Sequence, residues 1–378
     1  MKARFAAVLS LTVLLAAAGF AASPRRTKTT TSYEGGKRSG SDWVGGDAIS
    51  DFSRHTRVDS GRSHRNLTLF PVVAPGVRRP NVDLPLDKAV AMGLIGISEL
   101  EESEVNRLRV KNKAKSPVFV MAGEMLRGGK QDRIVGSDLV LPPGADLIIP
   151  VFCVEHGRWS GAGGGFSAGH SLAGSDIRGA AGGGGRAGGG QSAVWSKVAE
   201  QQQRLRAPSP TGALKSVHDS AEVRDRMKPY LHALTDLAED NPKACGIVAV
   251  IDDEILTADL FSSPALFQQI WPQLLESYII DALDREEGED HHVREKDSHH
   301  SLNATFVQRW LNKVGSATRK PKDTPGSGML YELRGSELVG STLVLDKGVV
   351  HMELFPEYPV KPIEYNSLEF RRDRLRVE

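Results

Sequence analysis

The sequence has little cysteine, almost no net charge and no long apolar run beyond its first residues. Its two cysteines, Cys153 and Cys245, lie in apolar stretches, which favours buried free thiols over the disulfide that export would permit. The 48 basic and 47 acidic residues give a formal net charge of +1, so the basic excess of a nucleic-acid-binding protein is missing. Later apolar runs fall short of the ~20 residues of a membrane-spanning helix. We therefore expect no nucleic-acid partner and no membrane span in the mature chain. The sequence does not indicate the oligomeric state.

The N-terminal segment has the three parts of a secretory signal peptide. Lys2 and Arg4 precede an apolar run from Phe5 to Phe20, and the small residues Gly19 and Ala21 fit a cleavage site. The alternative is an uncleaved anchor, but about 16 apolar residues are short for a bilayer span. We expect residues 1–21 to be a signal peptide and the mature protein to be secreted or periplasmic.

Composition divides the next part of the chain. Residues 22–65 are rich in Ser, Thr, Gly and Arg, which predicts a disordered linker before a folded body that begins near Asn66. The main domain is expected at residues 66–285. A glycine-rich insert at residues 160–190 interrupts this domain and offers too little apolar surface to pack by itself.

The segment after the main domain, residues 286–300, combines acidic residues with four histidines. Imidazole rings bind transition metals, but no defined ligand spacing recurs here, and a solvated loop between two helices is the alternative. We assign no metal ligand. A C-terminal helix and β-meander, residues 301–378, follow and are expected to pack on the main domain. The four histidines are His291, His292, His299 and His300.

Apolar periodicity predicts an α+β fold with a mostly antiparallel sheet core of meander strands, packed with several helices. Asp346-Lys347-Gly348 is expected to form a tight hairpin turn. The expected strands are 66–73, 105–110, 117–124, 133–141, 147–155, 246–251, 254–260, 329–333, 341–345 and 349–355. The expected helices are 86–92, 192–205, 221–239, 264–287 and 303–314.

Charged and polar residues gather at the ends of three consecutive apolar strands of this sheet. If the three strands form a meander, the first and the third run in the same direction. Glu124, the turn Lys130–Arg133 and the segment Glu155–Trp159 then share one edge of the sheet. Two strand spacings would separate the carboxylates of Glu124 and Glu155, about 10 Å.

Alternating fixed charges at one sheet edge favour a site for a small polar ligand. The alternative is a set of surface ion pairs of small value, such as Glu124 with Arg133. We take Glu124 and Glu155 as candidate catalytic residues. The candidate ligand-binding residues are Gly128, Lys130, Gln131, Arg133, Arg158 and Trp159.

Two blocks, VMAGEMLRGGKQDRIV (Val120–Val135) and PVFCVEHGRW (Pro150–Trp159), resemble the signature of the ARG and Rhodanese-Phosphatase-superfamily-associated protein domain family. The similarity covers Asn66 to Tyr278 and is interrupted by the glycine-rich insert. The sequence departs from the signature at Gly129 and Asp132, where many members have Ala and Asn. The signature residues that carry over are Glu124, Gly128, Lys130, Gln131, Arg133, Glu155, Gly157, Arg158 and Trp159.

The resemblance implies a role near ADP-ribose or nucleotide-derived metabolites, because genomic association with ADP-ribosylglycohydrolases and rhodanese-type phosphatases defines the family. One hypothesis is a hydrolase, in which Glu124 or Glu155 activates water while Lys130, Arg133 and Arg158 bind an anion that is nucleotide-, ADP-ribose- or sugar-phosphate-like. The other is a non-catalytic ligand-binding or envelope module. The sequence contains no cofactor fingerprint, metal signature or nucleophile elbow that would decide between them.

Overall fold

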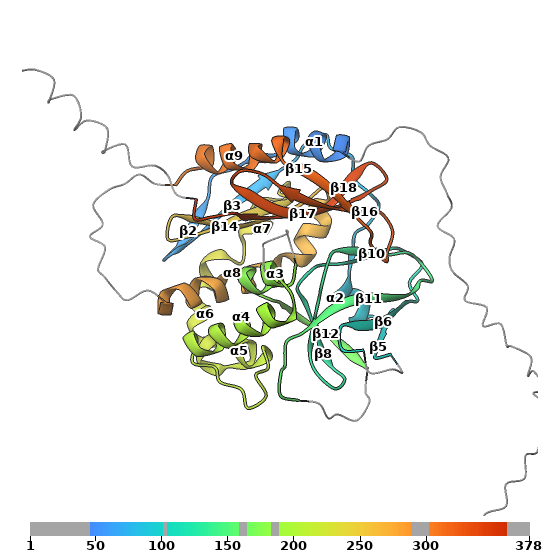
Figure 1. Ribbon diagram of the computed structural model, residues 1–378. Helices are drawn as coiled ribbons and strands as arrows, with labels where there is room; N and C mark the ends of the chain where they lie inside the picture. The colour runs from blue at the N-terminus through green and yellow to red at the C-terminus, as the bar shows by residue number, and fades with distance from the viewer. Residues whose placement is uncertain (1–45, 101–103, 159–164, 183–188, 289–301, 361–378) are drawn as a thin grey trace, which may run out of the picture. The chain divides into compact units, whose positions relative to one another are not determined.

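The computed structural model describes residues 46–100, 104–158, 165–182, 189–288 and 302–360, which belong to one compact unit (Figure 1). The predicted signal peptide, Trp159 and residues 289–300 of the histidine-rich loop lie outside these ranges. The sheets and helices confirm the predicted α+β class. No helix among the described residues has the length and apolar character needed to cross a membrane.

A nine-stranded sheet forms the larger part of the unit, and its paired strands are antiparallel. In spatial order the strands are β1 (Arg57–Val58), β3 (Leu67–Val73), β13 (Gly246–Ile251), β14 (Glu254–Phe261), β18 (Gly348–Pro356), β17 (Leu338–Leu345), β16 (Met329–Arg334) and β15 (Thr318–Lys322), with β2 (Arg62–His64) paired to β3. The pairing of β18 with β14 makes the C-terminal segment a continuation of the main sheet. The helix of the same segment, residues 304–312, packs on one face of this sheet.

Both faces of the nine-stranded sheet are covered, which explains why its central strands are apolar at successive positions. Along β13, Ile247 and Ala249 belong to one core and Val248 to the other, as side chains alternate along a strand. Helices α1 (Gly46–His55) and α9 (Ala304–Asn312) cover one face (Figure 1). Helices α6 (Ala221–Leu234) and α8 (Pro264–Gly288) cover the other.

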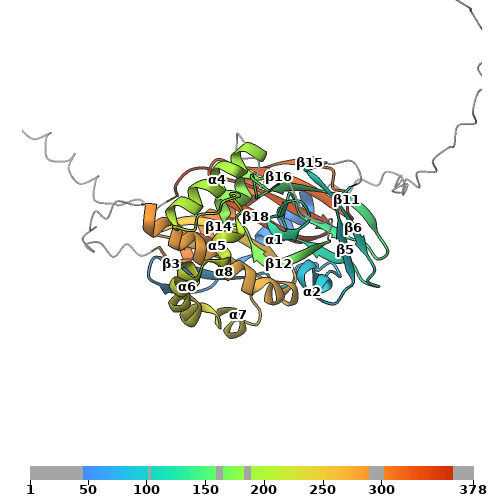
Figure 2. The ribbon, with the colours of Figure 1, turned by 90° about the horizontal axis from the view of Figure 1, so that it is seen from below.

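Two smaller sheets pack around a separate apolar core. The six-stranded sheet has the order β12 (Phe166–Leu172), β8 (Glu124–Gly128), β9 (Arg133–Val135), β11 (Asp146–Cys153), β6 (Arg107–Asn112) and β5 (Ile95–Ser98). The three-stranded sheet has the order β10 (Leu139–Leu141), β7 (Val118–Val120) and β4 (Leu84–Pro85), of which β4 and β7 are parallel. Figure 2 shows β5, β6 and β11 on the side of the unit away from α4, α5 and α6.

Six further helices complete the described part of the chain. They are α2 (Leu86–Ala91), α3 (Ser175–Ala180), α4 (Gln191–Arg204), α5 (Lys215–Asp219), α7 (Leu237–Asp240) and the 3₁₀ helix η2 (Lys313–Ser316). The hairpin predicted at Asp346 is confirmed: Asp346 and Lys347 have φ of 47° and 66° between β17 and β18. Positive φ at both central residues is the feature of the turn that matches the twist of a two-stranded hairpin.

The folded part begins at α1 and not near Asn66, so the predicted extent of the disordered linker is wrong. Ile49 and Phe52 of α1 are 0% and 2% exposed and pack on the nine-stranded sheet. They stand three residues apart and therefore share one face of the helix. A single ten-residue helix among Ser, Gly and Arg residues is too short to change the composition of the segment.

The glycine-rich insert, expected to offer too little apolar surface to pack by itself, contributes to the core of the main domain. Its described residues form β12 and α3, and Leu172 and Ile177 are buried in the largest core. Arg178 of α3 is buried as well. Backbone pairing with β8 holds β12 in place. A few large side chains are therefore sufficient to pack these two elements against the core.

Candidate functional site

The first signature block forms a long hairpin with an interruption in each arm. Val118–Val120 of β7 pairs with β10, and Met125 of β8 pairs with Ile134 of β9. The sequence predicted one strand at 117–124 and one at 133–141, but each arm contributes to two sheets. The hairpin turn, residues 129–132, lies between β8 and β9 and carries the candidate residues Lys130 and Gln131.

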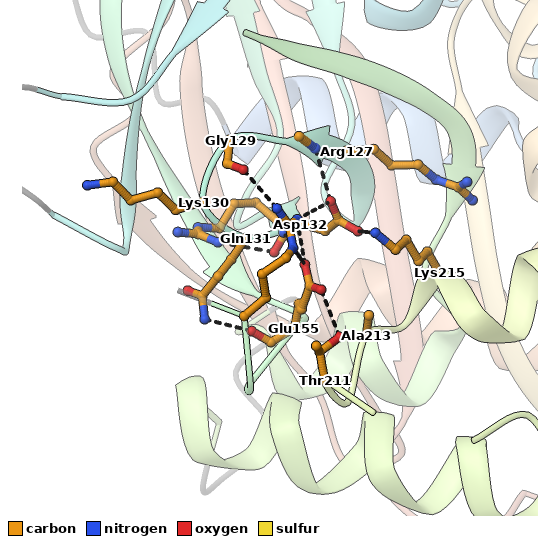
Figure 3. Close-up of polar contacts among 12 residues, drawn as sticks. Arg127, Gly129, Lys130, Gln131, Asp132, Glu155, Thr211, Ala213 and Lys215 are labelled. Atoms are coloured by element: carbon orange, nitrogen blue, oxygen red, sulfur yellow. Dashed lines mark hydrogen bonds and ion pairs between the residues drawn. The ribbon is translucent and has the colours of Figure 1, made fainter. Parts of the chain in front are cut away.

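Asp132, at the end of this turn, is the centre of a charged cluster (Figure 3). Its side chain is 1% exposed. Oδ1 accepts hydrogen bonds from the backbone N–H of Gly128 at 2.9 Å and from Nη2 of Arg158 at 3.2 Å. Oδ2 lies 3.3 Å from the ammonium nitrogen of Lys215. The carboxylate therefore ties the hairpin turn to residues from two other segments.

Glu155, just after β11, is the second buried carboxylate of the cluster. Oε2 accepts hydrogen bonds from the backbone N–H of Asp132 at 3.1 Å and from Nε of Arg158 at 2.8 Å. Oε1 accepts one from the hydroxyl of Thr211 at 2.8 Å. Burial by itself would raise the pKa of Glu155, but these hydrogen bonds and the charge of Arg158 bring it below its ordinary value. Glu155 is thus a buried anion that hydrogen-bond donors of the protein stabilise.

Arg158 joins the two carboxylates. In addition to its bonds with Glu155 and Asp132, its Nη1 donates to the carbonyl oxygen of Gly129 at 2.9 Å. The hydrogen bond to Glu155 raises the pKa of Arg158.

Gly128 has φ of 135°, and a Cβ atom there would lie 2.6 Å from the carbonyl oxygen of Gly165. The glycine requirement of the signature is explained at this position, because an L side chain would be strained and would collide.

Gln131 and Arg133 lie on the inner side of the turn. The amide nitrogen of Gln131 donates to the carbonyl oxygen of Glu155 at 2.8 Å, and its amide oxygen accepts from the thiol of Cys153 at 3.1 Å. Arg133 donates from Nε to the carbonyl oxygen of Val105 at 2.9 Å. Both side chains are buried and hold backbone groups in place, so they shape the turn.

The side chain of Lys130 does not point into the charged cluster. Its backbone N–H donates to Oε1 of Glu99 at 2.8 Å, and its side chain extends away from Asp132 and Glu155 in Figure 3. Trp159 lies outside the described residues. The structure therefore joins Gly128, Gln131, Arg133, Glu155 and Arg158 of the predicted set.

The comparison with protein families agrees with the signature. The profile of the ARG and Rhodanese-Phosphatase-superfamily-associated Protein domain family matches residues 55–355. The chain belongs to this family. No curated protein and no solved structure matches the chain. The family match extends past the resemblance noted between Asn66 and Tyr278, and it includes the C-terminal strands that complete the nine-stranded sheet.

Glu124, the remaining signature carboxylate of the family, does not belong to the cluster. Its Oε2 accepts the backbone N–H of Met121 at 2.9 Å, and Asp87 and Asp138 lie near it. Burial raises the pKa of Glu124 to about 8, with a smaller contribution from these two carboxylates and against the Met121 hydrogen bond. Glu124 is therefore protonated at neutral pH, whereas Glu155 is ionised.

The predicted common edge for Glu124 and Glu155 is wrong because of strand register. Leu126 of β8 lies level with Arg133 of β9, which pairs with Cys153 of β11. Glu124 precedes this level by two residues, and Glu155 lies two residues beyond it in the opposite direction. The offset of four residues adds about 13 Å along the strands to the expected separation of about 10 Å across them.

A second buried charge network lies beside Glu124 and had no signal in the sequence. Arg178 makes hydrogen bonds at 2.8 and 3.1 Å to the two carboxylate oxygens of Asp259, and it lies 2.7 Å from Glu353. Nδ1 of His351 lies 2.6 Å from Asp138. Although burial opposes it, the charge of Asp138 raises the pKa of His351 to about 10, so the imidazole is protonated. All five side chains are buried.

Three residues of the charged cluster were missed from the sequence. Asp132 was noted only as a departure from the family signature, yet it binds Arg158 and Lys215. Thr211 comes from the segment between α4 and α5, and Lys215 is the first residue of α5; no motif distinguishes this part of the sequence. The described residues contain no group of three or more His, Cys, Asp or Glu side chains that could hold a metal ion.

Proposed function

We propose that this protein binds a small anionic ligand at the charged cluster and does not hydrolyse it with Glu124 and Glu155. The observation that carries the proposal is the arrangement of charges in the cluster. The carboxylates of Asp132 and Glu155 are buried and each is paired with a cation, and these cations form the accessible rim. Such a rim presents N–H groups to an incoming anion.

The carboxylates are poorly suited to activate water. A general base needs an oxygen within reach of the water and a pKa near the working pH. Both oxygens of Glu155 are engaged, and its pKa is lowered. Glu124 is protonated at neutral pH and is offset from Glu155 along the strands. Their separation exceeds the roughly 6.5–9.5 Å between the two carboxyl groups of an inverting glycosidase.

Two cations of the cluster, Arg158 and Lys215, keep part of their side chains in contact with solvent, as does the neighbouring Arg127. Arg158, Arg127 and Lys215 are 25%, 27% and 38% exposed. The described contacts of Lys215 are an ion pair with Asp132 at 3.3 Å and no side-chain hydrogen bond, so its N–H donors can turn toward a ligand. Arg127 pairs with Asp219 through Nη1 and adds positive charge to the rim. A lysine with available donors beside further cations is what an oxyanion of a phosphate group requires.

The chemical class of the ligand follows from these donors and from the family. A phosphate-bearing metabolite, such as ADP-ribose, a nucleotide or a sugar phosphate, supplies the anionic oxygens.

Export by the predicted signal peptide is part of the same proposal, and sequencing the N-terminus of the protein from the cell envelope or medium tests it. A mature chain that begins near residue 22 is the expected result, and recovery of the intact N-terminus would contradict export by cleavage.

Binding is tested by the shift in thermal midpoint on adding ADP-ribose or inorganic phosphate, measured for wild type and for Lys215→Gln. We expect at least one probe to stabilise wild type and Lys215→Gln to bind it about tenfold more weakly, as the loss of one charge-assisted hydrogen bond implies. Lys228→Gln is the matched control, because Lys228 is an exposed lysine paired with Asp225 on α6.

Two results would contradict the proposal in different ways. If neither probe stabilises wild type, or if Lys215→Gln and wild type bind equally, the rim is not the binding site. If wild type releases phosphate or ribose from a probe and Glu155→Gln abolishes that turnover, the protein is a hydrolase after all.

A further inference from the structure

One end of the six-stranded sheet presents a row of cations to solvent. Along β6 and the residues after it, exposed and buried positions alternate, and every exposed position from 107 to 115 is an arginine or a lysine. Alternate side chains of a strand leave on one face, about 7 Å apart. Arg109 and Lys111 are 50% and 54% exposed and both reach Asp146 of β11, at 3.1 and 3.3 Å, so their charges lie side by side. Arg107 pairs with Glu104 at the other end of β6.

The buried side chain of Asn112 fixes the loop that continues this row. Its Nδ2 donates to the carbonyl oxygens of Leu141 and Pro142, both at 3.0 Å. Its Oδ1 accepts the backbone N–H of Ala114 at 2.8 Å. The loop at residues 113–116 is therefore held against the turn between β10 and β11, and the lysines on it have a defined position.

The cations of this row outnumber the carboxylates that contact them. Lys113 and Lys115 form no ion pair or side-chain hydrogen bond with another described residue. The two cations of β6 share one carboxylate, Asp146, and exposed ion pairs of this kind are weak. Asp83 precedes β4 at the far side of the loop, and its Oδ1 accepts the hydroxyl of Ser263 at 2.5 Å. The row thus keeps an excess of positive charge.

Two exposed apolar side chains adjoin the cations. Ile148 of β11 is level with Arg109 of β6 and is 44% exposed. Met92, at the end of α2, is 65% exposed. Two residues later, the carbonyl oxygen of Leu94 accepts the backbone N–H of Lys113 at 2.7 Å, which joins the loop of Met92 to the cationic row. We call this surface the basic face; it consists of Met92, Arg109, Lys111, Lys113, Lys115 and Ile148.

We propose that the basic face docks the protein on an anionic phospholipid surface. Its cations contact lipid phosphate groups, while Met92 and Ile148 enter the level of the headgroups. Each Lys or Arg beside an anionic bilayer strengthens binding about fivefold, and buried apolar area adds to this attraction. A soluble polyanion would use the same cations but not the two apolar side chains, which therefore favour a lipid surface. Because the chain has a formal net charge of only +1, the attraction is local to this face.

The test is co-sedimentation of the full chain with vesicles of phosphatidylcholine, with and without phosphatidylglycerol. We expect tighter binding to the anionic vesicles and a loss of this preference at high salt. Lys113→Gln and Lys115→Gln should each lower the partition coefficient on anionic vesicles about fivefold, and Met92→Gln by a similar factor. Lys228→Gln is the matched control, because it removes the same charge from an exposed lysine of α6. The N-terminal segment is common to all variants, so its contribution cancels.

A second measurement reports contact directly. Cys153 and Cys245 are buried, so an environment-sensitive fluorophore should react selectively with Met92→Cys or, as control, with Lys228→Cys. Anionic vesicles should shift the emission to the blue at position 92 and not at position 228. Equal vesicle binding by wild type and the lysine variants, or an unshifted label at position 92, would overturn the inference. Binding of polyphosphate through Lys113 and Lys115 without any binding of vesicles would also overturn it, since the partner would then be a soluble polyanion.

Discussion

Replacing Glu124 by glutamine removes one buried carboxyl group without a change in side-chain size. The amide oxygen of glutamine can still accept the backbone N–H of Met121, which now donates to Oε2 of Glu124 at 2.9 Å. The amide nitrogen gains Asp87 and Asp138 as nearby anionic acceptors, the same groups that oppose ionisation of Glu124. The substitution therefore isolates the cost of charging this position.

The size and sign of that cost follow from the pKa of Glu124, which is about 8 in the folded chain against an ordinary 4.5. Below pH 4.5 the group is protonated in both states and costs nothing. Between pH 4.5 and 8 the unfolded chain loses the proton and the folded chain retains it, so stability falls by about 1.4 kcal/mol per pH unit. Above pH 8 the full loss is about 5 kcal/mol, which is an upper bound.

Urea unfolding of wild type and Glu124→Gln at pH 6 and pH 9, followed by circular dichroism, measures the effect. The free energy of unfolding of the variant should rise relative to wild type by about 3 kcal/mol between these two pH values. Other titrating groups are common to both proteins and cancel in the difference. An equal difference at pH 6 and pH 9 would refute the reasoning, since Glu124 would then titrate as an exposed group does.

Glu155→Gln is the matched comparison and has the opposite sign. The folded chain lowers the pKa of Glu155, so its contribution to stability is present above the ordinary pKa and is lost as the pH falls through the folded value. Removing its charge at neutral pH should destabilise the protein by about 1–3 kcal/mol, because the partly buried Arg158 loses one of its two carboxylate partners. Two isosteric substitutions of signature glutamates should thus shift stability in opposite directions.

Three further predictions concern the fold. Arg178→Met removes the cation that bonds both carboxylate oxygens of the buried Asp259 and should lower the free energy of unfolding by about 3–5 kcal/mol, measured by urea unfolding; a loss below 1 kcal/mol would contradict the network. Phe52→Ala should cost about 3–5 kcal/mol by the same assay, whereas a disordered linker would show no change. Cys153 and Cys245 are buried and unpaired, so a reducing agent should leave the thermal midpoint unchanged; a lower midpoint would reveal a disulfide.

Sequence patterns were sufficient to predict those parts of the structure that depend on residues close together in the chain. The two-residue turn at Asp346 and the helix predicted at 264–287 depend on residues within one hairpin or one helix. The signature likewise indicated that the turn before Arg133 and the end of β11 meet, because consecutive antiparallel strands place these positions together. Glu155 and Arg158 were found in this way.

The tertiary structure alone decided which groups face the carboxylates. Lys215 lies 83 positions after Asp132, and Thr211 lies 56 after Glu155, so each contact exists only because the start of α5 and the segment before it pack against the hairpin turn and the end of β11. Register decided the place of Glu124, since an offset of a few residues along a strand moves a side chain by more than 10 Å. Burial then set the charge of Glu124, because desolvation disfavours its ionised form. How deeply a side chain is buried depends on the packing of distant segments, which the linear sequence does not give.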